Sequence, residues 1–243
     1  MVKLFSDKKR PVHMGRFPTE RLARIHYIPD LSKLTPWPNL SFQRPKGSTS
    51  IVPAMAEFQA MMDAVRDGSV NSVPSEIPND IRERANHLKA FAYFNDMSVV
   101  GIGPVTICDH LEKTRINPEI DRLSQALSTR QTKTLAAGID LIMADLKEAM
   151  AAKSEPITDH HTALVFLVDY RRDPKPEELG CDWVQDVQEE RAALLGNETA
   201  SVIANYIRVL GYSARSHSAT TTDVDLARLP VKSGVVQISG DRI

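Results

Sequence analysis

The stretch that decides the fold is ETASVIANYIRVLGYSARSHSATTTDVDLARL, residues 198–229. Its first half continues a helical pattern over residues 184–210, with apolar residues three and four apart and Gly211 at the C-cap position. Residues 212–219 are expected to form a short strand. Residues 222–230 begin with a Thr-Asp helix cap and predict a last helical segment that a proline ends. A long helix followed by a strand indicates a domain in which helices pack on a sheet.

Helical periodicity predicts further helices upstream of this stretch. The first covers residues 52–68, with Phe58 among the apolar residues of its buried face. The second begins near Asp80 and the third at Asn117, both residue types that cap helix N-termini. A fourth pattern covers residues 135–150. The chain is therefore rich in amphipathic helices.

Two runs of β-branched residues predict strands, over residues 99–107 and 163–170, the second as a central strand. The first strand contains Gly101 and Gly103, which favours a bulge or a close approach of another backbone. A dinucleotide-binding loop is not favoured, because Pro104 follows and no third glycine stands three residues on.

The first fifty residues differ from the rest of the chain. They carry many prolines, each of which fixes φ and removes a backbone donor, together with large apolar side chains such as Phe17, Trp37 and Phe42. We expect residues 1–50 to form an irregular arm that packs on the body or on a partner, and residues 51–243 to form the folded region. The prolines are Pro11, Pro18, Pro29, Pro36, Pro38 and Pro45.

Composition excludes several classes of function. The 243 residues carry 30 Lys and Arg and 31 Asp and Glu, a net charge of -1, so no basic field favours nucleic acid. No apolar run reaches the roughly 20 residues that span a bilayer, and the N-terminus lacks the apolar core of a secretory signal. With the two cysteines, Cys108 and Cys181, far apart, a disulfide framework is excluded and a cytoplasmic location is expected.

No metal site is expected. His160 and His161 are adjacent at the start of a predicted strand, where neighbouring side chains point to opposite faces. They therefore cannot easily share one ion, and no Cys or carboxylate cluster stands near them at ligand spacing.

Five residues are candidate contacts to a bound ligand, because they supply charge and hydroxyl donors beside the ends of predicted elements. They are Arg130, Lys133, His217, Ser218 and Thr221. Arg130 and Lys133 lie in a polar insert before a predicted helix, a place that suits phosphate or carboxylate groups. A solvated helix cap is the alternative interpretation of that insert.

Several runs resemble one family in order. They are RPVHMGRFPTERL (10–22), HLKAFAYFNDMSVVGIGPV (87–105), RQTKTLAAGIDLIMADLKE (130–148) and the stretch quoted first (198–229). Together they resemble the N-terminal part of cytoplasmic cobalamin-dependent reductive dehalogenases, and more loosely epoxyqueuosine reductase. The resemblance implies an α+β, nitroreductase-like layered fold, with helices around a small, mostly antiparallel sheet.

The resemblance also implies an enzyme in which two 4Fe–4S clusters pass electrons to cobalamin, which removes halogen from an organohalide. One such cluster needs four thiolates, and this chain has two isolated cysteines. The chain ends at Ile243, before the part in which the family carries its clusters and catalytic residues, and Pro230 stands where the pattern usually has Ala. No catalytic residue is therefore assigned, and the chain alone is not expected to be catalytic.

Three functional interpretations remain open. The first is an N-terminal domain or split subunit of a reductive dehalogenase-like oxidoreductase, which is structural or completes a cobalamin pocket. Its partner would be an iron–sulfur and cobalamin domain, encoded downstream or on a separate chain. The alternative is a stand-alone, non-redox cobalamin- or flavin-binding protein of the same fold. The third is a truncated product with only a packing role.

Overall fold

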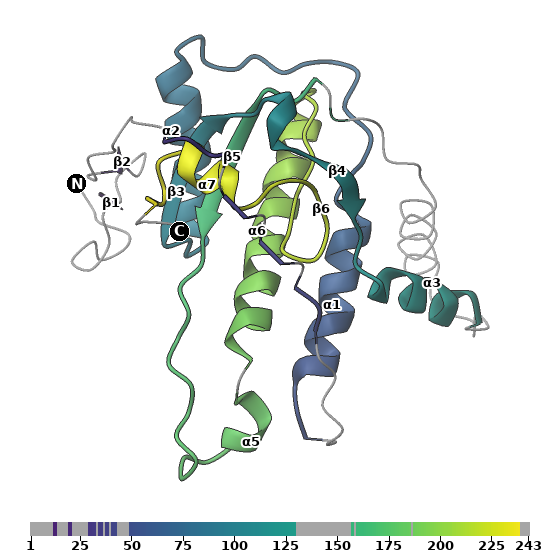
Figure 1. Ribbon diagram of the computed structural model, residues 1–243. Helices are drawn as coiled ribbons and strands as arrows, with labels where there is room; N and C mark the ends of the chain where they lie inside the picture. The colour runs from purple at the N-terminus through teal and green to yellow at the C-terminus, as the bar shows by residue number, and fades with distance from the viewer. Residues whose placement is uncertain are drawn as a thin grey trace.

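The computed structural model describes residues 49–129, 157, 159–185 and 187–238, with short pieces of residues 12–42 (Figure 1). Helices and strands are interspersed along the chain. In order they are β1 (Val12–His13), β2 (Thr19–Glu20), α1 (Val52–Ala64), α2 (Ile81–Phe94), β3 (Val99–Pro104), η1 (Ile107–Asp109), β4 (His110–Arg115), α3 (Glu119–Thr129), β5 (Thr162–Leu167), α5 (Cys181–Val184), α6 (Gln188–Val209), β6 (Thr222–Val224) and α7 (Arg228–Lys232).

The described strands form three antiparallel pairs, β1 with β2, β3 with β5, and β4 with β6. The longest ladder joins β3 to β5, from Val99 opposite Leu167 to Pro104 opposite Thr162. This arrangement confirms the α+β class and the antiparallel pairing. Among the described helices none is long and apolar enough to cross a membrane.

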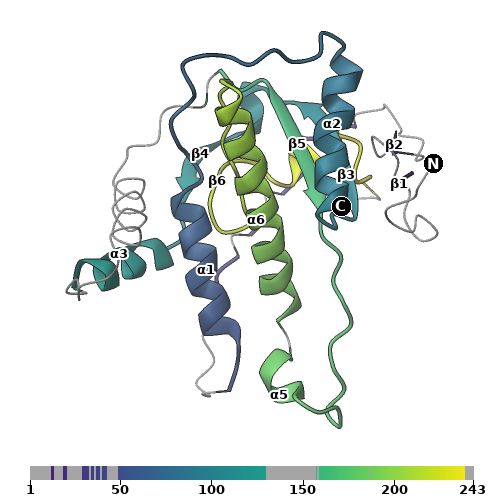
Figure 2. The same ribbon diagram turned by 180° about the vertical axis from the view of Figure 1, so that it is seen from behind.

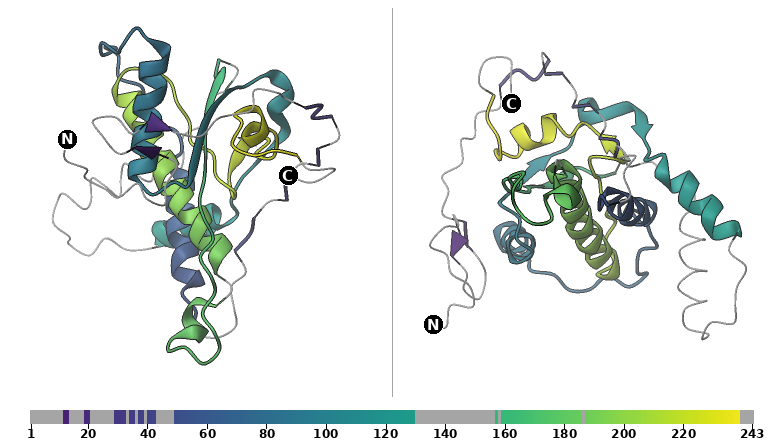
Figure 3. Two further views of the ribbon diagram at one scale, coloured as in Figure 1. Left: turned by 90° about the vertical axis from the view of Figure 1, so that its left-hand side faces the viewer. Right: turned by 90° about the horizontal axis from the view of Figure 1, so that it is seen from below.

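Strand β5 separates two apolar clusters. Leu164 and Phe166 pack toward the cluster that includes Tyr93 of α2 and Ile203 of α6. Ala163 and Val165 pack toward a second cluster with Leu229 of α7. Because successive side chains of a strand point to opposite faces, the β3–β5 pair is a middle layer with α2 and α6 on one side and α7 on the other (Figure 3).

The glycine pair of β3 permits the close contact of this layer with α7. A Cβ on Gly101 would lie 2.7 Å from the Ser233 carbonyl oxygen, and a Cβ on Gly103 would lie 3.0 Å from Ser233 Cα. Any larger residue would force the C-terminal end of α7 away from the strand. The close backbone approach predicted for these glycines is therefore confirmed.

The long helix predicted over residues 184–210 is found as α6, Gln188–Val209, whereas Val184 ends the separate short helix α5. The segment after it is different. Residues 212–219 form no strand, and the strand lies instead at β6, where a helix cap was predicted. The physical reason is that backbone groups of this segment bond to the body rather than to a ladder: Ser216 N–H donates to the Arg66 carbonyl at 3.2 Å, and Ala214 O accepts from Arg208 at 2.9 Å.

Three further features differ from the prediction. Residues 110–115 form β4, which the sequence pattern did not indicate, and Pro230 lies inside α7 rather than at its end. In the described part of the chain, β5 has β3 as its one strand neighbour and is not central. The helix predicted over residues 135–150 lies outside the described residues.

Pieces of the first fifty residues contact the body. Leu40 N–H donates to the Ala219 carbonyl at 3.2 Å, and the Trp37 carbonyl accepts from Arg115 at 2.5 Å. Leu31 is buried. These contacts bring described parts of the proline-rich segment over β4 and the loop before β6.

Candidate functional site

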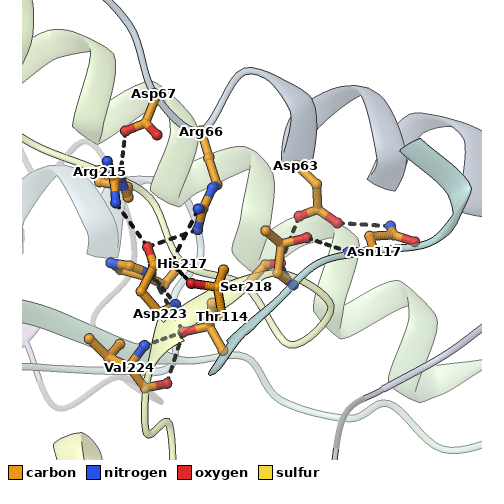
Figure 4. A network of polar contacts seen from close by, with 12 residues as sticks. Asp63, Arg66, Asp67, Thr114, Asn117, Arg215, His217, Ser218, Asp223 and Val224 are labelled. Carbon is orange, nitrogen blue, oxygen red and sulfur yellow. Dashed lines mark hydrogen bonds and ion pairs between the residues drawn. The ribbon is translucent and has the colours of Figure 1, made fainter. Parts of the chain in front are cut away.

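A buried carboxylate, Asp63 of α1, organises the polar centre of the molecule (Figure 4). Figures 1 and 2 show α1 alongside α6, and Asp63 lies between them and the loop before β6. Its two oxygens accept five side-chain hydrogen bonds, from Gln59 Nε2 (3.2 Å), Asn117 Nδ2 (2.8 Å), Asn197 Nδ2 (2.7 Å), Ser218 Oγ (2.7 Å) and Thr220 Oγ1 (2.5 Å). One carboxylate thus joins four segments that are far apart in sequence.

A second carboxylate, Asp223 of β6, is surrounded by cations. Arg66 donates to both of its oxygens at 3.0 and 3.3 Å, Arg215 donates at 3.0 Å, and the Thr114 hydroxyl donates at 2.7 Å. Burial alone would raise the pKa of Asp223, but the Thr114 hydrogen bond and the Arg66 charge outweigh it and lower the pKa to about 2. Asp223 is therefore ionised throughout the physiological range.

His217 lies against this ion-pair cluster. Its Nδ1 is 4.0 Å from an Asp223 oxygen, and the side chain is 17% exposed. The backbone N–H of Asp223 donates to Nδ1 at 3.4 Å, which assigns the ring proton to Nε2. Burial lowers the pKa of His217 to about 4. The Asp223 charge alone would raise the pKa, whereas the Arg66 charge lowers it further. The imidazole is therefore neutral at pH 7.

The two candidate hydroxyls in the same loop are buried and engaged. Ser218 Oγ donates to Asp63 and accepts from the backbone N–H of Thr221 at 3.0 Å. Thr221 Oγ1 accepts from the backbone N–H of Asn117 at 3.0 Å. Both hydroxyls hold the loop in place by bonding to the protein itself.

The structure thus brings His217, Ser218 and Thr221 together in one loop. Arg130 and Lys133 lie outside the described residues. The assignment of all five residues as ligand contacts stays a prediction.

Sequence reasoning missed the residues that organise this centre. The predicted apolar face of α1 included Phe58, which is 57% exposed, whereas Gln59 and Asp63 are buried. Gln59 and Asp63 lie on the buried face of α1, with Val52, Ala56 and Ala60, because both bond to Thr220 of the distant loop. A hydropathy pattern cannot show this, and the one available signal was a carboxylate, Asp63, among the apolar residues at the end of the helix.

Another buried carboxylate, Asp109, joins η1 to α7. Asp109 of η1 accepts hydrogen bonds from Lys232 and, at 3.3 Å, from Arg228, both in α7. Thr106 donates to it through its hydroxyl and its backbone N–H, each at 2.8 Å. Burial alone would raise the pKa of Asp109, but the Lys232 hydrogen bond, with those from Thr106, holds the pKa below its usual value.

The described residues contain no group of three or more His, Cys, Asp or Glu side chains placed to hold a metal ion. Cys108 is exposed and Cys181 is buried, and each is a free thiol. His160 Nε2 lies 2.8 Å from the Ser213 hydroxyl. The hydrogen-bonding partner of His160 is therefore a serine rather than a second side chain of a type that binds metal ions.

No known protein family profile matches this chain, and no curated protein matches it. Solved structures of reductive dehalogenases are similar. One, whose structure suggests a mechanism for B12-dependent dehalogenation, is 27% identical with a TM-score of 0.61, over 98% of this chain and 28% of its own. The catabolic reductive dehalogenase NpRdhA with 3-bromo-4-hydroxybenzoic acid is 27% identical with a TM-score of 0.59, over 95% of this chain and 26% of its own.

A further structure of NpRdhA is 27% identical with a TM-score of 0.57, over 88% of this chain and 24% of its own. This chain therefore has a fold similar to part of a reductive dehalogenase. It spans about a quarter of the length of the chains that it matches.

Proposed function

We propose that this chain is a domain or split subunit of a reductive dehalogenase-like oxidoreductase, in which it serves as a structural domain. The observation that carries the proposal is the similarity of 98% of this chain to 28% of a reductive dehalogenase. The proposal includes the N-terminal place of this domain in the enzyme, its nitroreductase-like layering and a cytoplasmic location. The remaining part of the enzyme would carry the reaction.

Cobalamin would supply the chemistry that removes the halogen, and the described polar groups do not fit it as a ready set of ligands. A corrinoid presents amide, phosphate and hydroxyl groups, which need free donors and acceptors on the protein. The Ser218 and Thr221 hydroxyls already bond within the protein. Among the described buried side chains, the atoms without a partner belong to Gln59, Asp67 and Arg208, and none belongs to the candidate loop. This supports a structural role.

The electron-transfer clusters would also lie outside this chain. A 4Fe–4S cluster needs four thiolates, whereas the sequence has two cysteines. We propose that the partner is an iron–sulfur and cobalamin-carrying polypeptide, encoded downstream or separately. No step of the dehalogenation is assigned to residues of this chain.

Co-expression of this chain with that polypeptide tests the proposal. We expect a stoichiometric complex on gel filtration, with the cobalamin absorbance following the complex. This chain alone, mixed with cobalamin or FMN and passed through the same column, is expected to emerge colourless. Two separate peaks in the co-expression experiment would overturn the proposal.

The same gel-filtration experiment distinguishes this proposal from the alternative function. If this chain alone retained cobalamin or FMN absorbance, it would be a stand-alone binding protein of the same fold. Substitution of His217 by Gln would then test the candidate loop, since His217 has the most exposed of the described candidate side chains. Loss of the retained absorbance in that variant, with an unchanged circular dichroism spectrum, would assign the ligand to this loop.

A further inference from the structure

The proline-rich segment before α1 crosses the face of the molecule that carries the candidate loop, residues 217–221. In Figure 1 the purple pieces of this segment run past the loop before β6 toward the start of α1. We call its described residues the strap: 29–32, 34, 35, 37, 38 and 40–42. The strap touches the candidate loop directly, because Leu40 N–H donates to the Ala219 carbonyl at 3.2 Å. A segment far away in the sequence thus lies on the candidate loop.

A second contact fastens the strap to β4. The Trp37 carbonyl accepts from Arg115 Nη1 at 2.5 Å. Arg115 follows Thr114, whose hydroxyl donates to Asp223 at 2.7 Å. The strap is therefore attached beside the ion-pair cluster around Asp223 as well as at the candidate loop.

The candidate loop turns polar side chains inward and its Ala219 carbonyl outward. Ser218 Oγ and Thr220 Oγ1 donate to the buried Asp63, and Ser218 N–H donates to the Thr221 carbonyl. The Ala219 carbonyl lies between these side chains in the sequence and accepts from the strap instead. The strap therefore covers the outer side of this loop.

His217, in the same loop, carries a donor without a partner. Its Nδ1 accepts from the Asp223 backbone N–H, so its Nε2 carries the proton. Within the described residues, no side chain or backbone group bonds to Nε2. The imidazole is 17% exposed. It can therefore donate a hydrogen bond to an oxygen acceptor that reaches it from outside.

The strap buries little of its own surface. Of its described residues Leu31 alone is buried, whereas Trp37 is 49% exposed. A segment with so few buried side chains belongs to the least stable part of a fold and opens locally. The loop beneath it is different, because its side chains bond to the buried Asp63. The strap can therefore come away while the loop stays in place.

We propose that the strap is a releasable cover, an autoinhibitory contact that keeps oxygen acceptors away from His217 until the strap is displaced. Release leaves the candidate loop in its present conformation and opens it to solvent. The inference goes beyond the proposed function and does not depend on it, because the cover and the loop both belong to this chain.

The reactivity of His217 with diethyl pyrocarbonate at pH 7, mapped by mass spectrometry, tests the cover, because this reagent acylates neutral imidazole. His161, which is exposed, is the reference within the same chain. Arg115→Gln and Leu40→Pro each remove the donor of one strap contact. Each is expected to raise the rate at His217 about tenfold, since one hydrogen bond shifts a local opening equilibrium by about that factor. The rate at His161 is expected to stay unchanged.

Two matched controls separate the strap contacts from general effects of substitution. Lys113→Gln changes an exposed side chain on the same strand as Arg115, and Ser41→Pro changes the exposed residue after Leu40. Both are expected to leave the rate at His217 unchanged. Urea unfolding is expected to give similar midpoints for all four variants.

Three outcomes would overturn the inference. The first is an equal rate at His217 in the original chain and in both strap variants, because the strap would then cover nothing. The second is a rise in rate that a control variant shares. The third is a rise that comes with a lower urea midpoint, since the strap would then be a structural part of the domain rather than a cover.

Discussion

Single residues hold this domain together through charge placed in its interior. Asp63 is buried and accepts hydrogen bonds from five side chains, which come from α1, α6, the segment before α3 and the loop before β6. Without the carboxylate the Asn117 and Asn197 amides would lose this acceptor, whereas Gln59 Nε2 would keep its bond to Thr220 Oγ1 at 2.8 Å. A buried unpaired donor costs about 1–3 kcal/mol. Asp63 therefore joins these segments through hydrogen bonds, as apolar packing joins segments in the hydrophobic clusters.

Replacement of Asp63 by Asn tests this role. The amide keeps one acceptor oxygen and turns an NH2 group toward the remaining donors, so we expect a loss of about 3 kcal/mol in the free energy of unfolding. The measurement is the urea midpoint by circular dichroism. Asp173→Asn, an exposed carboxylate in the loop after β5, is the control and is expected to change the midpoint little. Equal midpoints for both variants would contradict the role of Asp63.

His217 makes stability depend on pH. The folded protein holds its pKa at about 4, below the usual 6.5, so the unfolded chain binds more protons between those values. Stability is therefore complete above pH 6.5 and falls as the pH falls toward 4. Between pH 7 and pH 5 we expect His217 to contribute a loss of about 2 kcal/mol.

The His217→Gln variant is expected to lose that share of the pH dependence. Urea unfolding at pH 7 and pH 5 measures it, with His161→Gln, an exposed histidine, as the control that retains it. A His217→Gln variant with the full pH dependence would show that another group titrates.

At the scale of elements, the sequence predicted the helices best where a cap residue marks their start. Asp80 accepts from the backbone N–H of Arg82 at 2.9 Å, and Asn117 accepts from that of Glu119 at 3.0 Å, so both predicted caps are confirmed. Capping is a local interaction between near neighbours, and local sequence is sufficient to show it.

The errors have a different cause. The sequence predicts a strand over residues 212–219, but Ser216 N–H donates to the Arg66 carbonyl instead, and Phe58 is exposed because Asp63 faces the interior in its place. These choices depend on partners more than a hundred residues away, which a local pattern does not contain. The same reason explains why Asp63 and Asp223 were not predicted as the organising residues.

Two glycines, Gly196 inside α6 and Gly211 directly after its C-cap residue, allow a matched test of backbone geometry. Gly211 adopts φ +88°, and a Cβ there would lie 2.6 Å from Pro74 Cα. Gly196 is inside the helix, where a Cβ would meet nothing closer than Val168 Cγ2 at 3.7 Å. We expect Gly211→Ala to destabilise the protein by about 2 kcal/mol or more, and Gly196→Ala to stabilise it by up to about 1 kcal/mol.

Thermal unfolding of the two alanine variants gives the comparison directly. A shift of the same sign in both would contradict it, because the two substitutions add the same methyl group and differ only in backbone conformation and free space.

At the scale of the whole molecule, ion pairs close the fold between distant segments. Asp109 and Lys232 are 123 positions apart and join η1 to α7, while Arg66 and Asp223 are 157 positions apart and join the end of α1 to β6. Together with the β4–β6 pairing, these contacts make residues 222–232 part of the central domain. The C-terminal elements are therefore expected to unfold with α1 and β3 in one transition.

A double-mutant cycle on Asp109 and Lys232 tests this closure. Lys232→Met leaves a buried carboxylate without its nearest cation and is expected to cost about 3 kcal/mol. Asp109→Asn removes the negative charge. In that background, Lys232→Met should therefore lower the free energy of unfolding by at least about 1 kcal/mol less than it does in the original chain. The control cycle pairs Asp109→Asn with Lys113→Met, whose side chain is exposed on β4, and is expected to be additive. Additive costs for Asp109 and Lys232 as well would mean that this ion pair does not couple α7 to the rest of the domain, because two groups that stabilise each other cannot be removed independently.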